Sequence, residues 1–489
     1  MPERRPRRGD DTFCKQQSLR EYTGTIRHLD ADRARELVAL FRRPIEANEE
    51  SLPSDVDDPI TAATCGSLTL ARSAADGPTD AIGHYATHLY LHEVLRLPIS
   101  VARELARHRG HLYLDKLTDI TDAVAAELGK HVGGGLSLNN LRELSVAAAW
   151  SLGRHDGELS LSRLKDLDDD AALGLAQHDN ELYLWGLTHL SSPAAAALSR
   201  HRGDLFLDGI VRLPDRVAVH LARHAGRLHL HGTTRLKDAA AHSLGRRTGF
   251  LCLKRLRSLT PVQAQLLAVH RGPLLLASLD VTDAVAHHLG QHEGSLSLTV
   301  SPGIGCHLLE KLVQHRGPLT LRGLKDLDQR RARLLAEQPA RNGIRGLSGL
   351  FLDDVDHVAP PVAAILAGHE AGSLSLNGIT LLTEDTARAV VRHPLLCLDG
   401  VESVTDRVAD ILASHEGGTL SLKGLRRCCG SGLAKLRRNP GIELPRHLRA
   451  EPAPSAGGPA AAPTRPSRED LILAIQRIAE QGEEFLHPA

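Results

Sequence analysis

The segment Leu112 to His131, LYLDKLTDITDAVAAELGKH, contains the pattern that decides the fold. Leu112 and Leu114 alternate with Tyr113 and Asp115, which predicts a short strand with one buried face. After Thr121, a residue suited to cap a helix, the apolar spacing changes to that of a helix. The buried stripe of that helix is expected to consist of Val124, Ala125, Leu128 and His131, with Gly133 as its left-handed end.

The same unit recurs along most of the chain. Successive Leu-x-Leu triplets start 21 to 24 residues apart, except for one interval of 31 residues after Leu319. Ten copies also contain Ala-x-x-Leu-x-x-His. A unit of about 23 residues cannot bury its own apolar face, so the copies must stack. The sixteen triplets start at Leu68, Leu89, Leu112, Leu136, Leu159, Leu182, Leu205, Leu228, Leu251, Leu274, Leu296, Leu319, Leu350, Leu374, Leu396 and Leu420.

This repeat resembles the leucine-rich-repeat family in its Leu-x-Leu strands, its length, and its strand and helix per turn. The resemblance covers Leu68 to Leu425, about three quarters of the 489 residues. It implies an α/β open right-handed solenoid of about 16 repeats, with a parallel sheet on a concave face that binds a partner, and it supplies no catalytic residue. The chain is a divergent member, because the family's Asn or Cys after the strand is replaced by Leu117, Leu141, Leu164, Leu187 and Ile210.

The segments outside the repeats have different compositions. Residues 1–67 are expected to form a disordered basic tail and a helical cap, with an amphipathic helix at Leu29 to Phe41. Residues 68–425 form the predicted solenoid, with an irregular repeat at 319–349, and the basic segment 426–450 is the expected C-terminal cap. A Pro/Ala linker at 451–466 then precedes an amphipathic helix at 467–489, which is either a docking peptide or a cap that folds back.

Twelve of the 28 histidines occupy one repeat position. A metal ladder or a pH sensor is one interpretation, since imidazole binds metals and titrates near neutrality. We favour a structural ladder in which neutral rings bond backbone groups at the helix C-terminus, because Arg247 and Gln338 replace histidine in two copies. The twelve residues are His108, His131, His155, His178, His201, His224, His270, His292, His315, His369, His393 and His415.

Aromatic residues are scarce, with only 13 in the chain, yet seven lie at outward positions of the strands. Such rings either fill space beside neighbouring strands or mark an interface. Acidic residues accompany them, which favours a partner that carries basic and apolar groups. The predicted binding residues on the concave face are Tyr113, Glu158, Glu181, Tyr183, Trp185, Asp204, Phe206 and Asp208.

The remaining composition limits the classes of function. The formal net charge is zero, which gives no general attraction to nucleic acid or anionic membranes, although the N-terminal arginines and Arg426 to Arg449 leave nucleic-acid binding as a weaker alternative. Seven scattered cysteines without metal-ligand spacing suggest reduced thiols in a cytoplasmic protein. We expect no metal and no cofactor, although His229 and His231 with Asp208 offer an adventitious metal position.

Catalytic motifs are missing from the sequence, including nucleotide-binding glycine loops and the metalloprotease pattern. We therefore expect a non-catalytic scaffold that recognises a protein or peptide on its concave face, with no nucleic acid, membrane or small-molecule substrate. The alternative is a regulatory or substrate-adaptor subunit of an enzyme complex whose catalytic domain is on another chain.

Overall fold

The computed structural model describes residues 29–42, 88–277, 279–338, 348–370, 372–428 and 430–449. The triplet at Leu68, the predicted linker at 451–466 and the predicted helix at 467–489 lie outside these residues. So do the predicted basic tail and residues 339–347 of the irregular repeat.

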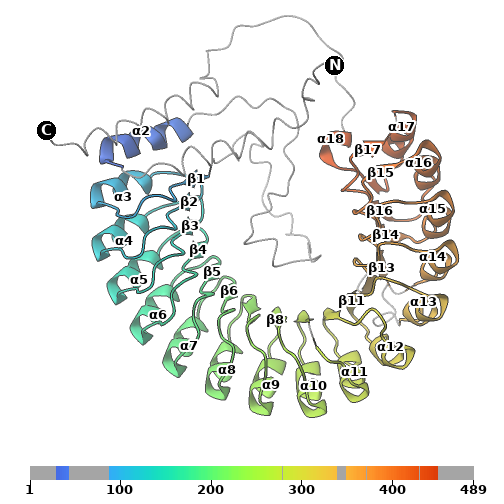
Figure 1. Cartoon of the computed structure of the whole chain (residues 1–489), viewed down its shortest axis with the longest axis horizontal. Helices are drawn as coiled ribbons and strands as arrows, with labels where there is room; N and C mark the ends of the chain where they lie inside the picture. The colour runs from blue at the N-terminus through green and yellow to red at the C-terminus, as the bar shows by residue number, and fades with distance from the viewer. Residues whose placement is uncertain are drawn as a thin grey trace, which may run out of the picture. The chain divides into compact units, whose positions relative to one another are not determined.

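The chain forms an α/β solenoid in which strands and helices alternate, as the sequence predicts (Figure 1). Each of the fifteen Leu-x-Leu triplets from Leu89 to Leu420 coincides with a strand. These strands and one further strand form a single parallel sheet in chain order. The sixteen strands are β1 (Leu89–Tyr90), β2 (Leu112–Tyr113), β3 (Leu136–Ser137), β4 (Leu159–Ser160), β5 (Leu182–Tyr183), β6 (Leu205–Phe206), β7 (Leu228–His229), β8 (Leu251–Leu253), β9 (Leu274–Leu276), β10 (Leu296–Thr299), β11 (Pro318–Arg322), β12 (Ser348–Phe351), β13 (Gly372–Ser375), β14 (Leu395–Cys397), β16 (Thr419–Ser421) and β18 (Ile442–Glu443).

The helices that follow the strands are short. A peptide of seven to nine residues does not hold a helix in water, so these helices depend on packing against the sheet and on one another. The helices of the repeats are α3 (Ile99–Leu105), α4 (Asp122–Leu128), α5 (Val146–Leu152), α6 (Asp169–Leu175), α7 (Ser192–Leu198), α8 (Asp215–Leu221), α9 (Asp238–Gly245), α10 (Pro261–Ala268), α11 (Asp283–Gly290), α12 (Cys306–Leu312), α13 (Gln329–Ala336), α14 (Pro360–Leu366), α15 (Glu384–Val390), α16 (Asp406–Ala413) and α17 (Gly430–Arg438).

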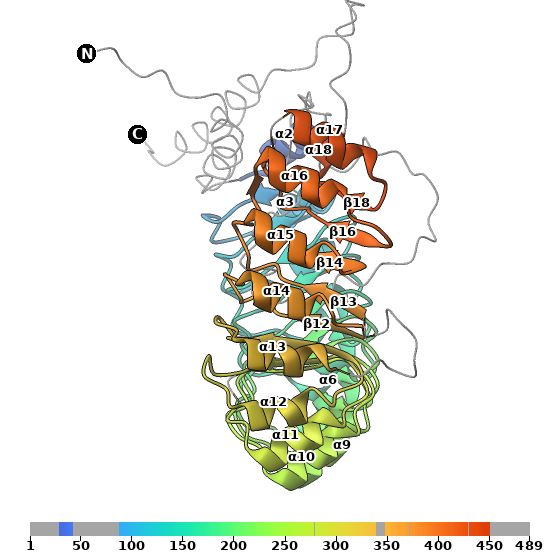
Figure 2. The same ribbon diagram turned by 90° about the vertical axis from the view of Figure 1, so that its right-hand side faces the viewer.

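Two compact units make up the chain. Of the described residues, the first unit contains 29–141 and 154–160, and the second contains 142–153 and 161–449, with the gaps given above. In the second unit the strands lie on the inner side of an arc and the helices on the outer side (Figure 1). Figure 2 shows its later strands, β12, β13, β14, β16 and β18, stacked beside α13 to α16. We call the side of the sheet that faces away from the helices the strand face.

The core is made of the leucines of the triplets. Leu205 pairs in register with Leu182 and Leu228, and all three side chains are fully buried. Small alanines such as Ala195 and Ala218 bring each helix close to this leucine layer, and they are also fully buried. Burial of one leucine side chain contributes about 1.5–3 kcal/mol, and every repeat adds several.

Helix α4 begins as the sequence predicts and ends differently. The Thr121 side chain accepts a hydrogen bond from the backbone N–H of Val124. The predicted left-handed end at Gly133 is wrong, because the helix ends at Leu128 and its C-cap, Gly129, is right-handed with φ −62°. Gly133 does have φ 89°, but it lies in the loop that leads to β3. The backbone N–H of His131 closes the last turn by bonding Leu128 O at 2.9 Å.

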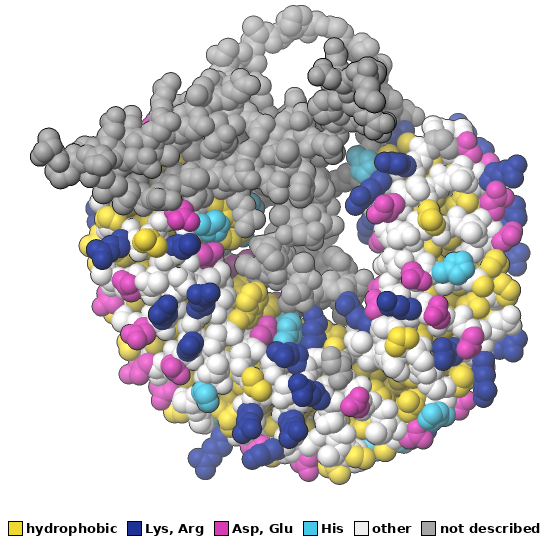
Figure 3. Space-filling view, viewed as in Figure 1, with side chains coloured by type: hydrophobic (Ala, Val, Ile, Leu, Met, Phe, Trp, Pro, Cys, Tyr) yellow, Lys and Arg dark blue, Asp and Glu magenta, His cyan; other side chains and the backbone are white. Residues whose placement is uncertain are grey.

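The surface of the described residues carries mixed charge. Lys and Arg side chains lie among Asp and Glu side chains on the face seen in Figure 3. No helix among the described residues is long and apolar enough to cross a bilayer.

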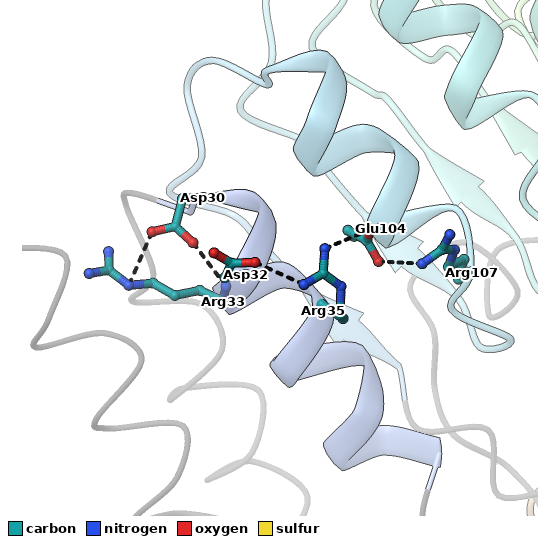
Figure 4. A network of polar contacts seen from close by, with 6 residues as sticks. All are labelled: Asp30, Asp32, Arg33, Arg35, Glu104 and Arg107. Atoms are coloured by element: carbon teal, nitrogen blue, oxygen red, sulfur yellow. Dashed lines mark hydrogen bonds and ion pairs between the residues drawn. The ribbon is translucent and has the colours of Figure 1, made fainter.

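Near the N-terminus, helix α2 (Ala31–Arg42) packs against α3. Its apolar side, which includes Leu37 and Val38, is buried. Arg35 joins the two helices through an ion pair with Glu104 at 3.3 Å, and Glu104 also pairs with Arg107 at 2.7 Å (Figure 4). We propose that α2 caps the solenoid, as the amphipathic pattern of this segment predicts.

The predicted C-terminal cap contains more regular structure than the sequence indicates. Strand β18 adds to the sheet by pairing Ile442 with Leu420. A separate two-stranded parallel sheet joins β15 (Ser403–Val404) to β17 (Arg427–Cys428). The described chain then ends in the short helix α18 (Arg446–Arg449).

Candidate binding site on the strand face

The outward residues of the strands form columns, because the leucines of neighbouring strands stay in register. In the second unit, Tyr183 pairs with Phe206, and Phe206 pairs with His229. His229 in turn pairs with Cys252 of the next strand. The sheet therefore places aromatic, imidazole and thiol side chains next to one another on the strand face.

Three rings of this column form a continuous stack. The ring centroids of Tyr183 and Phe206 are 4.3 Å apart, and those of Phe206 and His229 are 4.0 Å apart. Trp185 packs edge-on against Tyr183 at 5.5 Å. These rings lie at outward positions, as expected, yet Tyr183 and Phe206 are each only 5% exposed. Trp185 is the half-buried member of the group, which we call the aromatic cluster: Tyr183, Trp185 and Phe206.

The indole N–H of Trp185 is the polar group of this cluster. Its nitrogen, Nε1, is buried and has no hydrogen-bond partner among the described residues. A buried donor without an acceptor costs about 1–3 kcal/mol, so native proteins normally satisfy such groups. A carbonyl or carboxylate of a bound partner would satisfy it.

The predicted acidic residues beside the cluster are engaged by the next strand. Asp204 Oδ1 accepts a hydrogen bond from the backbone N–H of Arg227 at 2.9 Å, and Arg227 Nε lies 3.7 Å from Asp204 Oδ2. Asp208 Oδ1 accepts from the backbone N–H of His231 at 3.0 Å. Burial raises the pKa of Asp208 to about 6. Two of the predicted acidic residues, Asp204 and Asp208, thus join neighbouring strands.

The eight predicted binding residues fall in both units. Tyr113 belongs to the first unit, where its ring stacks on Tyr90 with centroids 4.5 Å apart. Glu158 is also in the first unit and is half-buried. The second unit holds the other six residues, which are Glu181, Tyr183, Trp185, Asp204, Phe206 and Asp208.

The histidine row is buried throughout. All twelve residues are less than 5% exposed, and the rings of consecutive copies stack, as in His292 and His315 with centroids 5.6 Å apart. Eleven of these histidines lie three residues beyond a helix leucine, and His393 lies three residues beyond Val390. All twelve are in the turn after the helix and not in its last turn. Most of the helices end at that leucine, and α10, α11 and α16 end one residue later. The histidine backbone N–H then bonds the leucine carbonyl, as in His270 to Leu267 O at 3.0 Å.

Backbone carbonyls of the preceding repeat accept hydrogen bonds from several of these rings. His131 Nε2 donates to Gly110 O at 3.0 Å, and His155 Nδ1 donates to His131 O at 2.9 Å. His393 Nε2 donates in the same way to His369 O at 3.0 Å. The row therefore connects successive turns of the solenoid through their backbones.

The residues that replace histidine make equivalent bonds. Gln338 Nε2 donates to His315 O at 3.1 Å and to Gly317 O at 2.9 Å. The Arg247 guanidinium donates to the carbonyl of His224. Asn439, which sequence reasoning did not include, occupies this position after α17 and donates to His415 O at 2.8 Å. Hydrogen bonding to the backbone is what these different side chains share.

Burial lowers the pKa of several histidines in this row. It lowers the pKa of His131 and His292 to about 3, with a further lowering by neighbouring imidazoles. Burial lowers the pKa of His201, His270 and His369 to about 4. These rings are neutral at physiological pH.

A second polar ladder on the strand face was missed by sequence reasoning. In the first unit, Ser137 Oγ donates to Asp115 Oδ1 at 2.5 Å. In the second, Ser421 Oγ donates to Asp399 Oδ1 at 2.6 Å, and the backbone N–H of Lys423 donates to the same oxygen at 2.8 Å. Leu117 and Val401 occupy the Asn or Cys position of the family in these two repeats, and the acids join strands from a different position. Alignment of the repeats would have revealed the recurrent Asp or Asn after the second leucine.

Comparisons with known proteins give structural neighbours only. No family model matches the chain, and no curated protein matches it. A leucine-rich-repeat protein of Leptospira interrogans is 15% identical with a TM-score of 0.33, over 73% of this chain and 94% of that chain. An internalin of Listeria monocytogenes is 13% identical with a TM-score of 0.34, over 66% and 83%. The TLR13–ssRNA13 complex matches at 12% identity with a TM-score of 0.32, over 71% and 62%. The leucine-rich-repeat-like fold of this chain is seen directly in its parallel sheet of leucine strands, each followed by a helix.

Proposed function

We propose that this chain is a non-catalytic scaffold that binds a protein or peptide on the strand face of its second unit. The observation that carries the proposal is the indole N–H of Trp185, which is buried beside Tyr183 and has no acceptor among the described residues. Trp and Tyr are enriched where interfaces have an apolar body and a polar group to satisfy. A partner segment that offers a carbonyl next to an apolar side chain fits this arrangement.

Electrostatics narrows the class of partner. Glu181 lies on the strand before Asp204, at the position that precedes the first leucine of each triplet, and it is half-buried. Arg227 offsets the charge of Asp204, so Glu181 is the acid of this group best placed to meet a basic residue. We therefore propose a partner with an apolar anchor for Trp185 and a Lys or Arg for Glu181.

The other parts of the proposal rest on the sequence. We infer a cytoplasmic location from the scattered cysteines, and we expect no nucleic acid or membrane partner because basic and acidic side chains are balanced. The alternative function, an adaptor subunit for an enzyme, uses the same surface and differs in what is bound. An enzyme that co-purifies in constant ratio with this chain would favour the alternative.

The chain provides a matched control for the test, since it has only two tryptophans. Trp150 is 40% exposed on helix α5, away from the strand face. Tagged wild-type protein, Trp185→Ala and Trp150→Ala should be purified from the native host and their bound partners quantified. We expect Trp185→Ala to lose a partner that Trp150→Ala retains. If Trp185→Ala folds and keeps every partner, the strand face is not the binding site.

A further inference from the structure

Three potential metal ligands meet on the strand face beside the aromatic cluster. The side-chain ligand atoms of His229, His231 and Cys252 all lie within 4.8 Å of one another. Among the residues that the structure describes, this is the one group of three His, Cys, Asp or Glu side chains with such convergence. In the histidine row, by comparison, several rings bond backbone carbonyls, among them those of His131, His155 and His393.

The sheet produces this convergence by its register. His229 is the last residue of β7, and His231 follows it by two residues in the next turn, with its ring beside that of His229. Cys252 is the cross-strand partner of His229 on β8. The paired strands β7 and β8 hold His229 and Cys252. His231 lies in the turn directly after β7, where its backbone N–H bonds Asp208 Oδ1 at 3.0 Å.

The geometry of the two imidazoles suits a shared ion. His229 Nδ1 and His231 Nε2 are 3.5 Å apart. Two nitrogens bound to one tetrahedral zinc ion, each at about 2.0–2.1 Å, are separated by roughly 3.3 Å. A small movement of either ring would reduce the nitrogen–nitrogen separation to that value, so that both nitrogens could bond one ion.

Asp208 orients His231 for this role. Its Oδ2 lies 3.3 Å from His231 Nδ1, and its Oδ1 accepts the backbone N–H of His231. A carboxylate that holds Nδ1–H leaves a lone pair on Nε2, the atom that faces His229. This is how metal-binding histidines are usually supported, and Asp208 acts here as a positioning residue.

The surroundings favour a zinc-class ion over a hard cation. Imidazole and thiolate are ligands for zinc and related transition metals, whereas calcium and magnesium require oxygen. The rings of Phe206 and Phe250 lie 4.0 and 5.1 Å from that of His229 and exclude water from one side. The His231 side chain is 15% exposed, which leaves solvent access on its side. The ammonium of Lys254 acts electrostatically on His231 and opposes a cation at this position.

We propose that His229, His231 and Cys252 form a site for one zinc-class ion, with Asp208 as the positioning residue. The competing explanation is a simple hydrogen bond between the two imidazoles, with Cys252 as a neutral space-filling thiol. The two explanations differ in whether the thiolate bonds a metal.

The test uses the full-length chain, treated with a chelator and then titrated with Zn²⁺ or Co²⁺ alone. We expect one equivalent of metal to bind, an absorption band of thiolate-to-cobalt charge transfer, and a melting temperature that rises with metal. Cys252→Ser should abolish the charge-transfer band and weaken the affinity by at least tenfold. Asp208→Asn should weaken it by about 10–100-fold while keeping the band.

Cys397 provides the matched control. It occupies the corresponding outward position of β14, between Ser375 and Ser421, where the described residues form no convergent group of three metal ligands. Cys397→Ser should bind metal as the wild type does. Circular dichroism of each metal-free variant verifies its fold, and His231→Gln offers a second route if Cys252→Ser does not fold. Binding without a thiolate band, or full binding by folded Cys252→Ser, would overturn the proposal.

Discussion

The Gln338 side-chain amide donates a hydrogen bond to the backbone carbonyl of His315, 3.1 Å away, at the repeat position where most copies have histidine. It also donates to Gly317 O at 2.9 Å. A side chain without imidazole chemistry thus joins two turns of the solenoid in the way that His155 joins its own turn to His131. Glutamine and histidine thus share one role at this repeat position, which is to donate a buried hydrogen bond to the backbone. A metal ladder or a pH sensor would not explain why glutamine can replace histidine there.

This relationship predicts how single histidines can be replaced. His155→Gln should leave the free energy of unfolding within about 1 kcal/mol of the wild type, because the amide can still donate to His131 O. His155→Leu should cost about 1–3 kcal/mol, since that carbonyl would stay buried and unpaired. Urea unfolding of both variants is the measurement. Equal stability of the two variants would contradict the hydrogen-bonding role.

Stability should depend on pH through the same row. The folded pKa of His131 and His292 is about 3, and that of His201, His224, His270 and His369 is about 4, below the value of 6.5 for an unfolded histidine. The unfolded chain therefore binds more protons below pH 6.5, so stability is complete above that pH and falls progressively toward pH 4. Each such histidine contributes up to about 1.4 kcal/mol per pH unit.

Melting curves between pH 8 and pH 5 measure this effect. Asp208, whose pKa is raised to about 6, acts in the opposite sense, but it is a single group against many histidines. His131→Gln should reduce the slope by about one proton. An unchanged melting temperature from pH 8 to pH 5.5 would show that the row is not buried and neutral.

The ladder on the strand face makes a separate prediction for Asp399. This carboxylate accepts from Ser421 Oγ at 2.6 Å and from the backbone N–H of Lys423 at 2.8 Å. Asp399→Ala should lower the free energy of unfolding by about 1–3 kcal/mol, because both donors lose their acceptor. Asp399→Asn keeps a carbonyl oxygen at this position and should lose less. Chemical denaturation that ranks the two variants in the reverse order would exclude the ladder as a stabilising feature.

Close stacking of the turns can be tested at a glycine. A Cβ atom on Gly400 would run into the backbone carbonyl of Asn377 in the preceding repeat. Gly400→Ala should therefore destabilise the chain by about 1–3 kcal/mol or more. Gly303 has open space around the same atom, and Gly303→Ala serves as the control. Similar melting temperatures for the two variants would mean that the turns are not packed this closely.

The regular spacing of the repeats in the sequence predicted most of the strands of the sheet. The positions of the strands could be read from the Leu-x-Leu triplets because a buried leucine recurs wherever the sheet gains a strand. Strand β18 was missed since its apolar residues, Ile442 and Leu444, depart from that triplet. The β15–β17 sheet has no apolar alternation and left no signal that pattern analysis can detect.

Side-chain partners on the strand face could be predicted only in part. The sequence indicated that Tyr183 and Phe206 point outward, but their mutual burial depends on the 4.3 Å approach that the sheet imposes. Our sequence analysis grouped His229 and His231 with Asp208 and did not include Cys252. The aligned triplets LHL and LCL nevertheless place Cys252 opposite His229. Column-by-column alignment of the copies would have identified that neighbour.

The fluorescence of single-tryptophan variants tests the proposed function most directly. Trp150→Phe leaves Trp185 as the only tryptophan, on the strand face, and Trp185→Phe leaves Trp150, on helix α5. When a purified partner is added, the emission of the Trp150→Phe protein should shift while that of the Trp185→Phe protein stays constant. A shift confined to the Trp185→Phe protein would place the partner on the helix side and contradict binding at the strand face.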